Sequence, residues 1–160
     1  MATIKVGSRV PSGKLQVMKD GRPAEVSTAE LFKGKRVALF SVPGAFTPTC
    51  SNAHLPGFVK NAKALKAKGI DTIACLSVND AFVMGAWGTV QKVGDKVVML
   101  ADGNATYTDK LGLGLDASKW GMGRRGKRFS MVVDDGVVTQ LNVDASGLKE
   151  TSAEAMLAKL

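Results

Sequence analysis

The sequence has little of the material from which several common protein classes are built. Two cysteines in 160 residues cannot form the disulfide framework of a small secreted protein, and a single histidine makes a zinc site improbable. One tyrosine and two tryptophans are too few for a stacking platform on nucleic acid. No apolar stretch approaches membrane-spanning length, and residues 1–6 lack the apolar core of a signal peptide. These features favour a cytoplasmic protein, unless a transit segment precedes this sequence.

The charge is biased towards one sign, with a formal net charge of +8. Such an excess can indicate nucleic-acid binding, because basic surfaces attract phosphate. Here Lys60, Lys63, Lys66 and Lys68 fall on the polar side of one expected helix, which is typical of a solvated surface. A basic nucleic-acid-binding domain is therefore a remote alternative, which a salt-dependent gel shift would test.

The chain is expected to form a single domain, residues 1–160, in which strands and helices alternate. Its content of 45% hydrophobic and 22% charged residues is typical of a globular domain with a continuous core. Apolar runs at 37–42 and 70–78 predict strands that are covered on both faces. Periodicity, turn and capping signals predict the remaining elements. These are a hairpin around Asp20-Gly21, helices over 28–32, 50–68 with a kink at Pro56, 81–91 and 106–111, a strand over 97–101, a hairpin over 129–143, and a last helix capped by Thr151 and Glu154.

This order predicts an α/β fold with a central mixed β-sheet flanked by helices on both faces and an N-terminal β-hairpin extension. Right-handed crossovers place the end of the strand 37–42 near the middle of the sheet. Active sites in such sheets lie beyond the carboxyl ends of the strands, and Cys50 falls there.

Cys50 is the strongest candidate for a functional residue. An apolar strand leads through Pro43-Gly44 to this thiol, at a point where a helix is expected to begin. Unpaired backbone N–H groups and the helix dipole favour the thiolate there, which is the form that attacks electrophiles. A free cysteine is more often an inert core residue, but hydroxyls at Thr47, Thr49 and Ser51 surround this one. We therefore predict a nucleophile.

Four sequence blocks carry a resemblance to a known family. They are PGAFTPTC at 43–50, HLPGF at 54–58, ACLSVND at 74–80 and RFSMVV at 128–133. In this order they resemble the type II (type 5, atypical) peroxiredoxins of the thioredoxin-like superfamily, over nearly the whole chain. The resemblance implies a thioredoxin-like fold and a thiol peroxidase that needs no metal or bound cofactor.

The resemblance also implies roles for the site residues. Cys50 would attack the peroxide, against which the Thr47 hydroxyl and the Cys50 backbone N–H would lie as preorganised donors. Arg128 would supply a fixed positive charge that favours the thiolate, and Pro43 would pack over the thiol and limit water. From the residues alone, Thr47 is equally a helix N-cap, Pro43 a turn residue and Arg128 a surface charge, so the family resemblance favours catalysis.

Cys75 leaves two alternatives open. It is either a buried strand thiol or the resolving cysteine that attacks a Cys50 sulfenic acid, as proposed for family members with this pair. Residues 147–160 hold no cysteine, so the other candidates for regenerating Cys50 are glutathione, glutaredoxin and thioredoxin. We favour the core interpretation because Ile73 and Leu76 predict a poorly accessible thiol. His54, four residues after Cys50, is expected to have a structural or hydrogen-bonding role.

The segment 121–126, GMGRRG, matches the dinucleotide fingerprint G-x-G-x-x-G. That fingerprint must follow a strand and open a helix, whereas this segment precedes a strand. A nucleotide site is therefore not expected, and the glycines are interpreted as a loop that lets the backbone approach Cys50.

The expected function is a cytoplasmic thiol-dependent peroxidase that reduces hydrogen peroxide and alkyl hydroperoxides through a Cys50 sulfenic acid. Glutaredoxin, glutathione or thioredoxin would regenerate the thiol. The resemblance also implies a homodimer, with Phe46, Phe82 and Trp120 as interface residues. The alternative from another class is a thioredoxin-like thiol chaperone or peroxide sensor that passes oxidation to a partner protein. A peroxide consumption assay with a small thiol separates the two.

Overall fold

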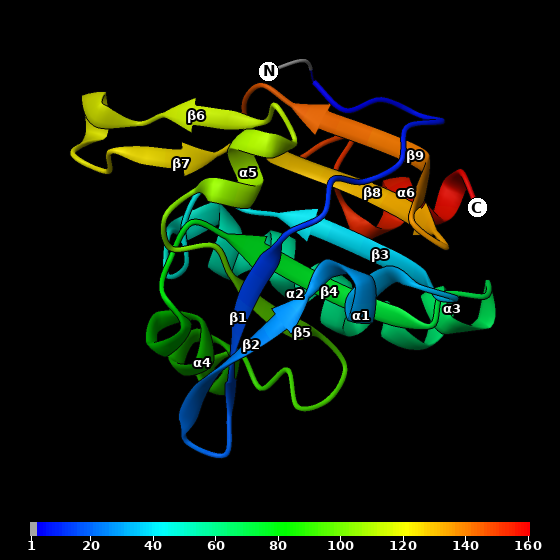
Figure 1. Cartoon of the computed structure of the whole chain (residues 1–160), viewed down its shortest axis with the longest axis horizontal. Helices are drawn as coiled ribbons and strands as arrows, with labels where there is room; N and C mark the ends of the chain where they lie inside the picture. Colours follow the sequence, from blue (N-terminus) through cyan, green and yellow to red (C-terminus); the bar gives the residue numbers. More distant parts are fainter. Residues whose placement is uncertain (1–2) are drawn as a thin grey trace.

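The computed structural model describes residues 3–160 and is built around a seven-stranded mixed sheet with strand order β2-β1-β5-β4-β3-β8-β9 (Figure 1). Its strands are β1 (Lys14–Lys19), β2 (Arg22–Ser27), β3 (Arg36–Ser41), β4 (Thr72–Ser77), β5 (Val98–Ala101), β8 (Arg128–Asp134) and β9 (Val137–Asp144). A separate two-stranded sheet pairs β6 (Gly114–Asp116) with β7 (Arg124–Gly126). The helices are α1 (Thr28–Phe32), η1 (Cys50–His54), α2 (Leu55–Lys60), α3 (Ala62–Ala67), α4 (Ala81–Val90), α5 (Thr106–Lys110), η2 (Ser118–Trp120) and α6 (Ala153–Ala158).

The predicted mixed sheet is confirmed. Strand β3 pairs in parallel with β4 and antiparallel with β8, and β4 pairs in parallel with β5. The end of β3 therefore lies inside the sheet, with paired strands on both sides, as the crossover rule predicts. The chain leaves this end towards Cys50, so the candidate nucleophile lies beyond the carboxyl end of a central strand.

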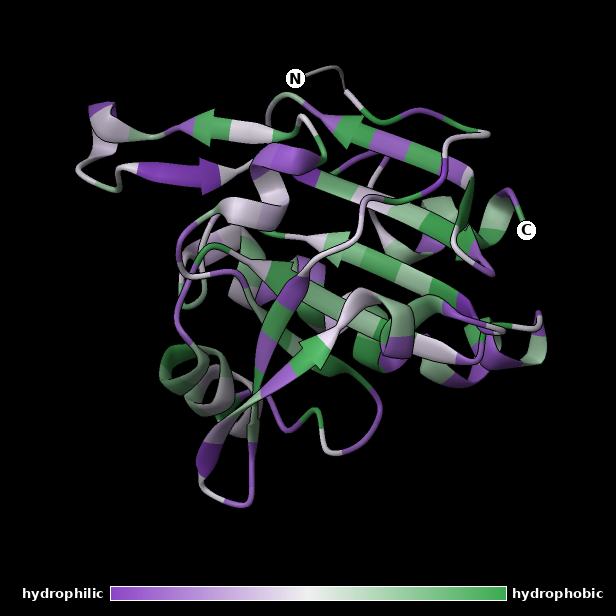
Figure 2. Cartoon of the chain, viewed as in Figure 1, coloured by the Kyte–Doolittle hydropathy of each residue, from purple (hydrophilic) through white to green (hydrophobic). Residues whose placement is uncertain are grey.

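Alternate residues of the central strands build two cores, one on each face of the sheet. On one face Ala38, Phe40, Ile73 and Cys75 pack against α2, α3, α4 and α6. On the other face Val37, Leu39, Ala74, Leu76, Met131 and Val133 pack with residues of α1, α5 and the N-terminal strand β1. The apolar colouring of β3 and β8 contrasts with the hydrophilic β7 and the tip of the β1–β2 hairpin (Figure 2). Burial on both faces explains why these strands read as continuous apolar runs.

The N-terminal hairpin and the first helix form as predicted. Asp20 and Gly21 both have positive φ, 51° and 79°, as a two-residue hairpin turn requires. The Ser27 hydroxyl accepts a hydrogen bond from the backbone N–H of Glu30 and donates to that residue's carboxylate, each at 3.1 Å. This reciprocal capping fixes the start of α1.

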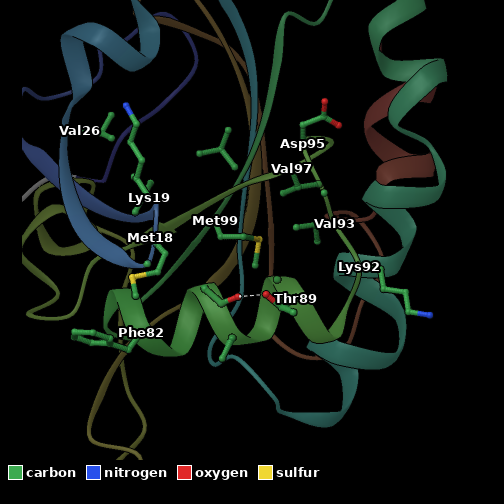
Figure 3. Close-up of a pocket in the computed structure, with 17 residues that line it drawn as sticks. Met18, Lys19, Val26, Phe82, Thr89, Lys92, Val93, Asp95, Val97 and Met99 are labelled. Carbon is green, nitrogen blue, oxygen red and sulfur yellow. Dashed lines mark hydrogen bonds between the residues drawn. The ribbon is translucent and has the colours of Figure 1, made fainter.

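Helix α4 carries two glycines because neighbouring strands pass close to it. A Cβ at Gly85 would lie 2.7 Å from Met18 Cγ of β1, and one at Gly88 would lie 3.0 Å from Met99 Cγ of β5. Both methionines line the groove between the hairpin and α4, which measures about 870 Å³ (Figure 3). The glycines that weaken the helix signal in the sequence are therefore packing residues.

The prediction of one helix over 50–68 is wrong, because the structure divides this segment into η1, α2 and α3. A π-helical turn, η1, opens it, because the backbone N–H of Leu55 bonds to the carbonyl of Cys50, five residues back. The disturbance predicted near Pro56 takes this form, since proline has no N–H to continue the regular ladder. A second interruption occurs at Asn61, which separates α2 from α3 and which nothing in the periodicity indicates.

The cap predicted for the last helix is also wrong. The N-cap of α6 is Ser152, whose hydroxyl accepts from the backbone N–H of Ala155 at 3.1 Å. The Thr151 hydroxyl instead donates to the Asp144 carboxylate at 2.6 Å. The Thr151 hydroxyl therefore binds Asp144 and does not cap the helix, although the local pattern predicts that cap.

Candidate active site

Cys50 is the first residue of the π-helical turn η1 and is 1% exposed. The turn is entered through an α-type hydrogen bond from the Ser51 N–H to the Thr47 carbonyl at 2.9 Å. The helix already begins at Pro48, and Thr49 is helical and offers no side-chain cap, so Cys50 lies within the first helical turn. The helix start predicted for the thiol is therefore confirmed, and its environment favours negative charge.

Arg128 lies directly against the thiol. It is the first residue of β8 and is 8% exposed, and its Nη2 group donates to Cys50 Sγ at 3.1 Å. The surface-charge interpretation of Arg128 is therefore wrong. Among residues 3–160, the ion pairs do not include this guanidinium, so no carboxylate partner competes for its charge. That charge is directed at the sulfur.

His54 holds the other side of the guanidinium. Its Nε2 lies 2.9 Å from the carbonyl oxygen of Thr151, which can only accept, so Nε2 carries the proton. Nδ1 is then a free acceptor, and Arg128 Nη1 donates to it at 2.7 Å. Burial and the positive charge of Arg128 lower the pKa of His54 to about 3, which keeps the ring neutral. The predicted hydrogen-bonding role of this histidine has its geometric basis here.

Pro43, Thr47 and Arg128 line one cavity of about 620 Å³ in front of the site. The Thr47 hydroxyl donates its only proton to the Gly44 carbonyl at 2.7 Å, so in this structure its oxygen is free to accept and does not supply the donor that the family resemblance implies. Thr47 immediately precedes the first helical residue, Pro48, and its carbonyl accepts the first helical bond, so it stands at the N-cap position, but its hydroxyl caps no helix N–H. The cavity walls are mainly apolar and include Leu115, Ala117, Trp120, Met122 and Val143.

Cys75 lies in the middle of β4, where it is fully buried and pairs in register with Phe40 and Met99. Burial raises the pKa of the Cys75 thiol well above its ordinary value, and a charge on Cys50 would raise it further. Both cysteines are free thiols. Cys75 belongs to the same core cluster as Cys50, and neither cysteine lines the cavity, which meets the site at Pro43, Thr47 and Arg128.

Three further residues support the site and were missed from the sequence. The indole Nε1 of Trp87, in α4, donates to the Ser51 hydroxyl at 3.0 Å and so ties α4 to the turn that carries Cys50. Asp144 and Thr151 fix the turn whose carbonyl receives His54. Trp87 and Thr151 reach the site through contacts 36 and 97 positions apart in the chain, which no local motif signals, whereas Asp144 acts on residues five to seven positions ahead of it.

The glycine-rich segment 121–126 is only partly a loop. Its last three residues form β7, which pairs with β6, so the loop interpretation holds for Gly121 and Gly123 but is wrong for Gly126. Arg124 forms an ion pair with Asp109, and Arg125 donates to the carbonyls of Met122 and Val78. Arg124 and Arg125 therefore stabilise the β6–β7 pair, which projects from the main sheet (Figure 1).

Within the described residues, no three His, Cys, Asp or Glu side chains gather as metal ligands. Over the same residues no helix has the length and apolar character needed to cross a bilayer.

Comparison with known proteins shows the family to which this fold belongs. The family model Redoxin matches residues 5–157. The chain is 49% identical over 166 residues to rice (Oryza sativa subsp. japonica) Peroxiredoxin-2E-2, chloroplastic, covering all of this chain and 74% of the relative. It is 46% identical over 162 residues to Peroxiredoxin-2C of Arabidopsis thaliana, covering 100% of both chains. The crystal structure of reduced Prx3 in complex with H2O2 from Vibrio vulnificus superimposes with a TM-score of 0.94 at 48% identity, over 98% of this chain and 99% of the other. The fold that carries the buried Cys50–Arg128 pair is therefore that of a known class of enzymes. The chain belongs to the redoxin family and is a peroxiredoxin, a thiol-dependent peroxidase.

Proposed function

We propose that Cys50 is the peroxidatic nucleophile and that Arg128 stabilises its thiolate. The observation that carries this proposal is the 3.1 Å contact between Arg128 Nη2 and Cys50 Sγ inside a buried site. A guanidinium stays charged at all working pH values, so it favours the thiolate without changing its own state. The neutral His54 orients this cation without cancelling its charge.

The proposed reaction is a displacement at oxygen. The Cys50 thiolate attacks the terminal oxygen of the hydroperoxide, so that an S–O bond forms and the O–O bond breaks. The sulfur is oxidised to a sulfenic acid, the peroxide is reduced, and the departing alkoxide or hydroxide takes up a proton to leave as an alcohol or water. Arg128 faces the charge that passes from sulfur to the leaving oxygen, which is where a preorganised donor lowers the barrier.

Thr47 and the cavity are proposed to receive the peroxide. The Thr47 hydroxyl proton is directed at the Gly44 carbonyl, so its oxygen is placed to accept the O–H of a hydroperoxide. The apolar walls formed by Leu115, Trp120 and Val143 suit an alkyl group, which supports alkyl hydroperoxides as substrates beside hydrogen peroxide. Pro43 closes the cavity on the side of the strand end.

An external thiol is proposed to regenerate Cys50. It would attack the sulfenic acid to give a mixed disulfide and water, and a second thiol would then release Cys50. Glutaredoxin with glutathione, or thioredoxin, would supply these thiols. Cys75 is a poor attacking group because its thiol is fully buried and its pKa is raised.

Assembly as a homodimer and a cytoplasmic location stay predictions. Phe46, Phe82 and Trp120 are 52%, 62% and 64% exposed, so they offer apolar surface for a second copy. Size-exclusion chromatography with light scattering, repeated on Phe46→Ser and Trp120→Ser, would test the dimer. The rice relative is named as chloroplastic, whereas the sequence favours the cytoplasm.

A steady-state assay with glutaredoxin, thioredoxin and glutathione side by side tests the proposed reductants. We expect peroxide consumption with at least one of them, in the wild type and in Cys75→Ser. If Cys75→Ser loses turnover with every reductant while its fold survives, the external-thiol proposal is wrong.

A further inference from the structure

The turn after β9 is fixed by one buried carboxylate. Asp144 is 8% exposed and accepts four hydrogen bonds. They come from the backbone N–H groups of Lys149 at 2.9 Å, Glu150 at 3.1 Å and Thr151 at 3.0 Å, and from the Thr151 hydroxyl at 2.6 Å. Burial alone would raise its pKa, but these hydrogen bonds outweigh it and lower the pKa of Asp144 to about 2. The charged carboxylate therefore closes the turn.

This turn ends at the carbonyl that receives His54. Because Asp144 holds both the N–H and the hydroxyl of Thr151, the Thr151 carbonyl oxygen has little freedom to move. It accepts the Nε2 proton of His54 at 2.9 Å, and that tautomer is the one whose Nδ1 can accept from Arg128. The position of the turn thereby decides which ring nitrogen of His54 is left to accept from Arg128.

Arg128 depends on this support because little else orients its guanidinium. Among the described residues, its side chain donates to His54 Nδ1 and to Cys50 Sγ, and it joins no ion pair. Asp144 itself is the cross-strand partner of Arg128 in the β8–β9 register. Both oxygens of that carboxylate accept hydrogen bonds from the turn, so it forms no ion pair with Arg128, although its negative charge raises the pKa of His54 slightly against the larger effects that lower it.

We propose that Asp144 is a positioning residue that acts through Thr151 and His54 to aim Arg128 at Cys50. The inference rests on the proposed roles of Cys50 and Arg128, and it extends the site by two residues, Asp144 and Thr151. Loss of this support lets the guanidinium rotate away from the sulfur, so the fraction of Cys50 present as thiolate at a given pH falls.

The test compares Asp144→Asn with a matched control, Asp102→Asn. An asparagine has one acceptor oxygen and a donating amide, so it cannot reproduce the four bonds. Asp102 is similarly buried, 5% exposed, and accepts from the N–H groups of Tyr107 and Thr108 and from the Thr108 hydroxyl. It closes a turn of the same kind, but the residues it holds, Tyr107 and Thr108, have no hydrogen bond to His54 or Arg128. Asp144, in contrast, holds Thr151, which does bind His54. Thr151→Val removes the hydroxyl bond alone, and Thr151→Ser should restore it.

Two readouts are measured on folded protein: the pH titration of Cys50 by thiolate absorbance, with Cys75→Ser as background, and kcat/KM for hydrogen peroxide. Outer partners of metal-bound histidines cost about 10- to 100-fold when removed, and we expect a loss of this order for Asp144→Asn. The titration midpoint should move upward in Asp144→Asn and Thr151→Val, and it should return towards the wild-type value in Thr151→Ser. Asp102→Asn should lose stability and keep both the midpoint and the rate.

Unchanged titration in a folded Asp144→Asn protein would overturn the proposal, and so would an equal shift in Asp102→Asn. If Asp144→Asn does not fold, an unchanged titration in Thr151→Val overturns it by itself. The titration does not require turnover, so a wild-type protein without peroxide reduction would contradict the proposed function while the positioning of Arg128 is still tested.

Discussion

At the scale of single residues, the site is a thiol and a cation held together away from water. Cys50 and Arg128 are both buried and in contact, and the neutral His54 supports the cation from the other side. The charge that we propose activates the sulfur is therefore in place before substrate arrives, so the proposed reaction needs no reorganisation of Arg128.

Arg128→Gln removes the charge and keeps a polar side chain. We expect a smaller fraction of Cys50 to be thiolate at a given pH, because a cation in contact with an acid favours its ionised form. Peroxide reduction should slow by about 100-fold, the cost of losing one preorganised donor. Stopped-flow kinetics and thiol titration measure both effects. A variant that keeps both values would make Arg128 a structural residue only.

Cys75→Ser should keep activity supported by glutaredoxin or glutathione, because the buried thiol is a poor nucleophile. Mass spectrometry of the peroxide-treated wild type should then show Cys50 as a mixed disulfide with the external thiol. Quantitative formation of an internal Cys50–Cys75 disulfide at the speed of turnover would be incompatible with this expectation.

At the scale of elements, the π-helical turn η1 is the least regular part of the site. Cys50 is 1% exposed, so an attacking protein thiol can reach it only after the turn opens locally. The hydrogen bond from Trp87 to Ser51 holds the turn to α4. Its strength should therefore set how often Cys50 becomes accessible.

Trp87→Phe and Ser51→Ala remove that bond from opposite sides. We expect alkylation of Cys50 to accelerate by roughly 2- to 10-fold in each, because a typical hydrogen bond contributes about 0.5–1.5 kcal/mol. The double variant should gain little more than either single change, since both remove one bond. Fully additive effects would show that the two residues act independently.

The elements also show what could be predicted from the sequence. The central strands, the hairpin and the position of Cys50 follow from local patterns, namely apolar runs, an Asp-Gly turn and a thiol at a helix start. The patterns Ser27…Glu30 and Thr151…Glu154 look alike, but only the first forms the predicted cap. The second fails because Asp144, seven residues earlier, binds the Thr151 hydroxyl.

The short strands β6 and β7 were not predicted because three residues, two of them arginine in β7, carry no periodicity. The contacts of His54 likewise depend on where Thr151 and Arg128 lie in the folded chain. Sequence patterns report neighbours along the chain, whereas the support of this site comes from residues 74 to 97 positions away from His54.

At the scale of the whole molecule, the site couples stability to pH. His54 is the sole histidine in the sequence, and its pKa falls from an ordinary 6.5 to about 3 in the fold. The unfolded chain therefore binds a proton that the folded chain does not, in the window between these two values. Stability contributed by the neutral ring is present above pH 6.5 and is lost as the pH falls towards 3.

We predict that the free energy of unfolding decreases by about 1.4 kcal/mol per pH unit below about pH 6, before most carboxylates titrate. His54→Gln keeps an acceptor and a donor but cannot titrate, so this slope should disappear from its denaturation curves between about pH 6 and pH 5. Equal slopes in the two proteins would show that the ring is not held neutral.

The central claim is that peroxide oxidises Cys50 and leaves Cys75 untouched. The most direct measurement is one turnover: reduced protein is mixed with one equivalent of hydrogen peroxide, a sulfenic-acid reagent is added, and both cysteine peptides are analysed by mass spectrometry. We predict stoichiometric labelling of Cys50, no label on Cys75, and no peroxide consumption by Cys50→Ser. Label on Cys75, or a Cys50→Ser protein that still turns over peroxide, would contradict the assignment.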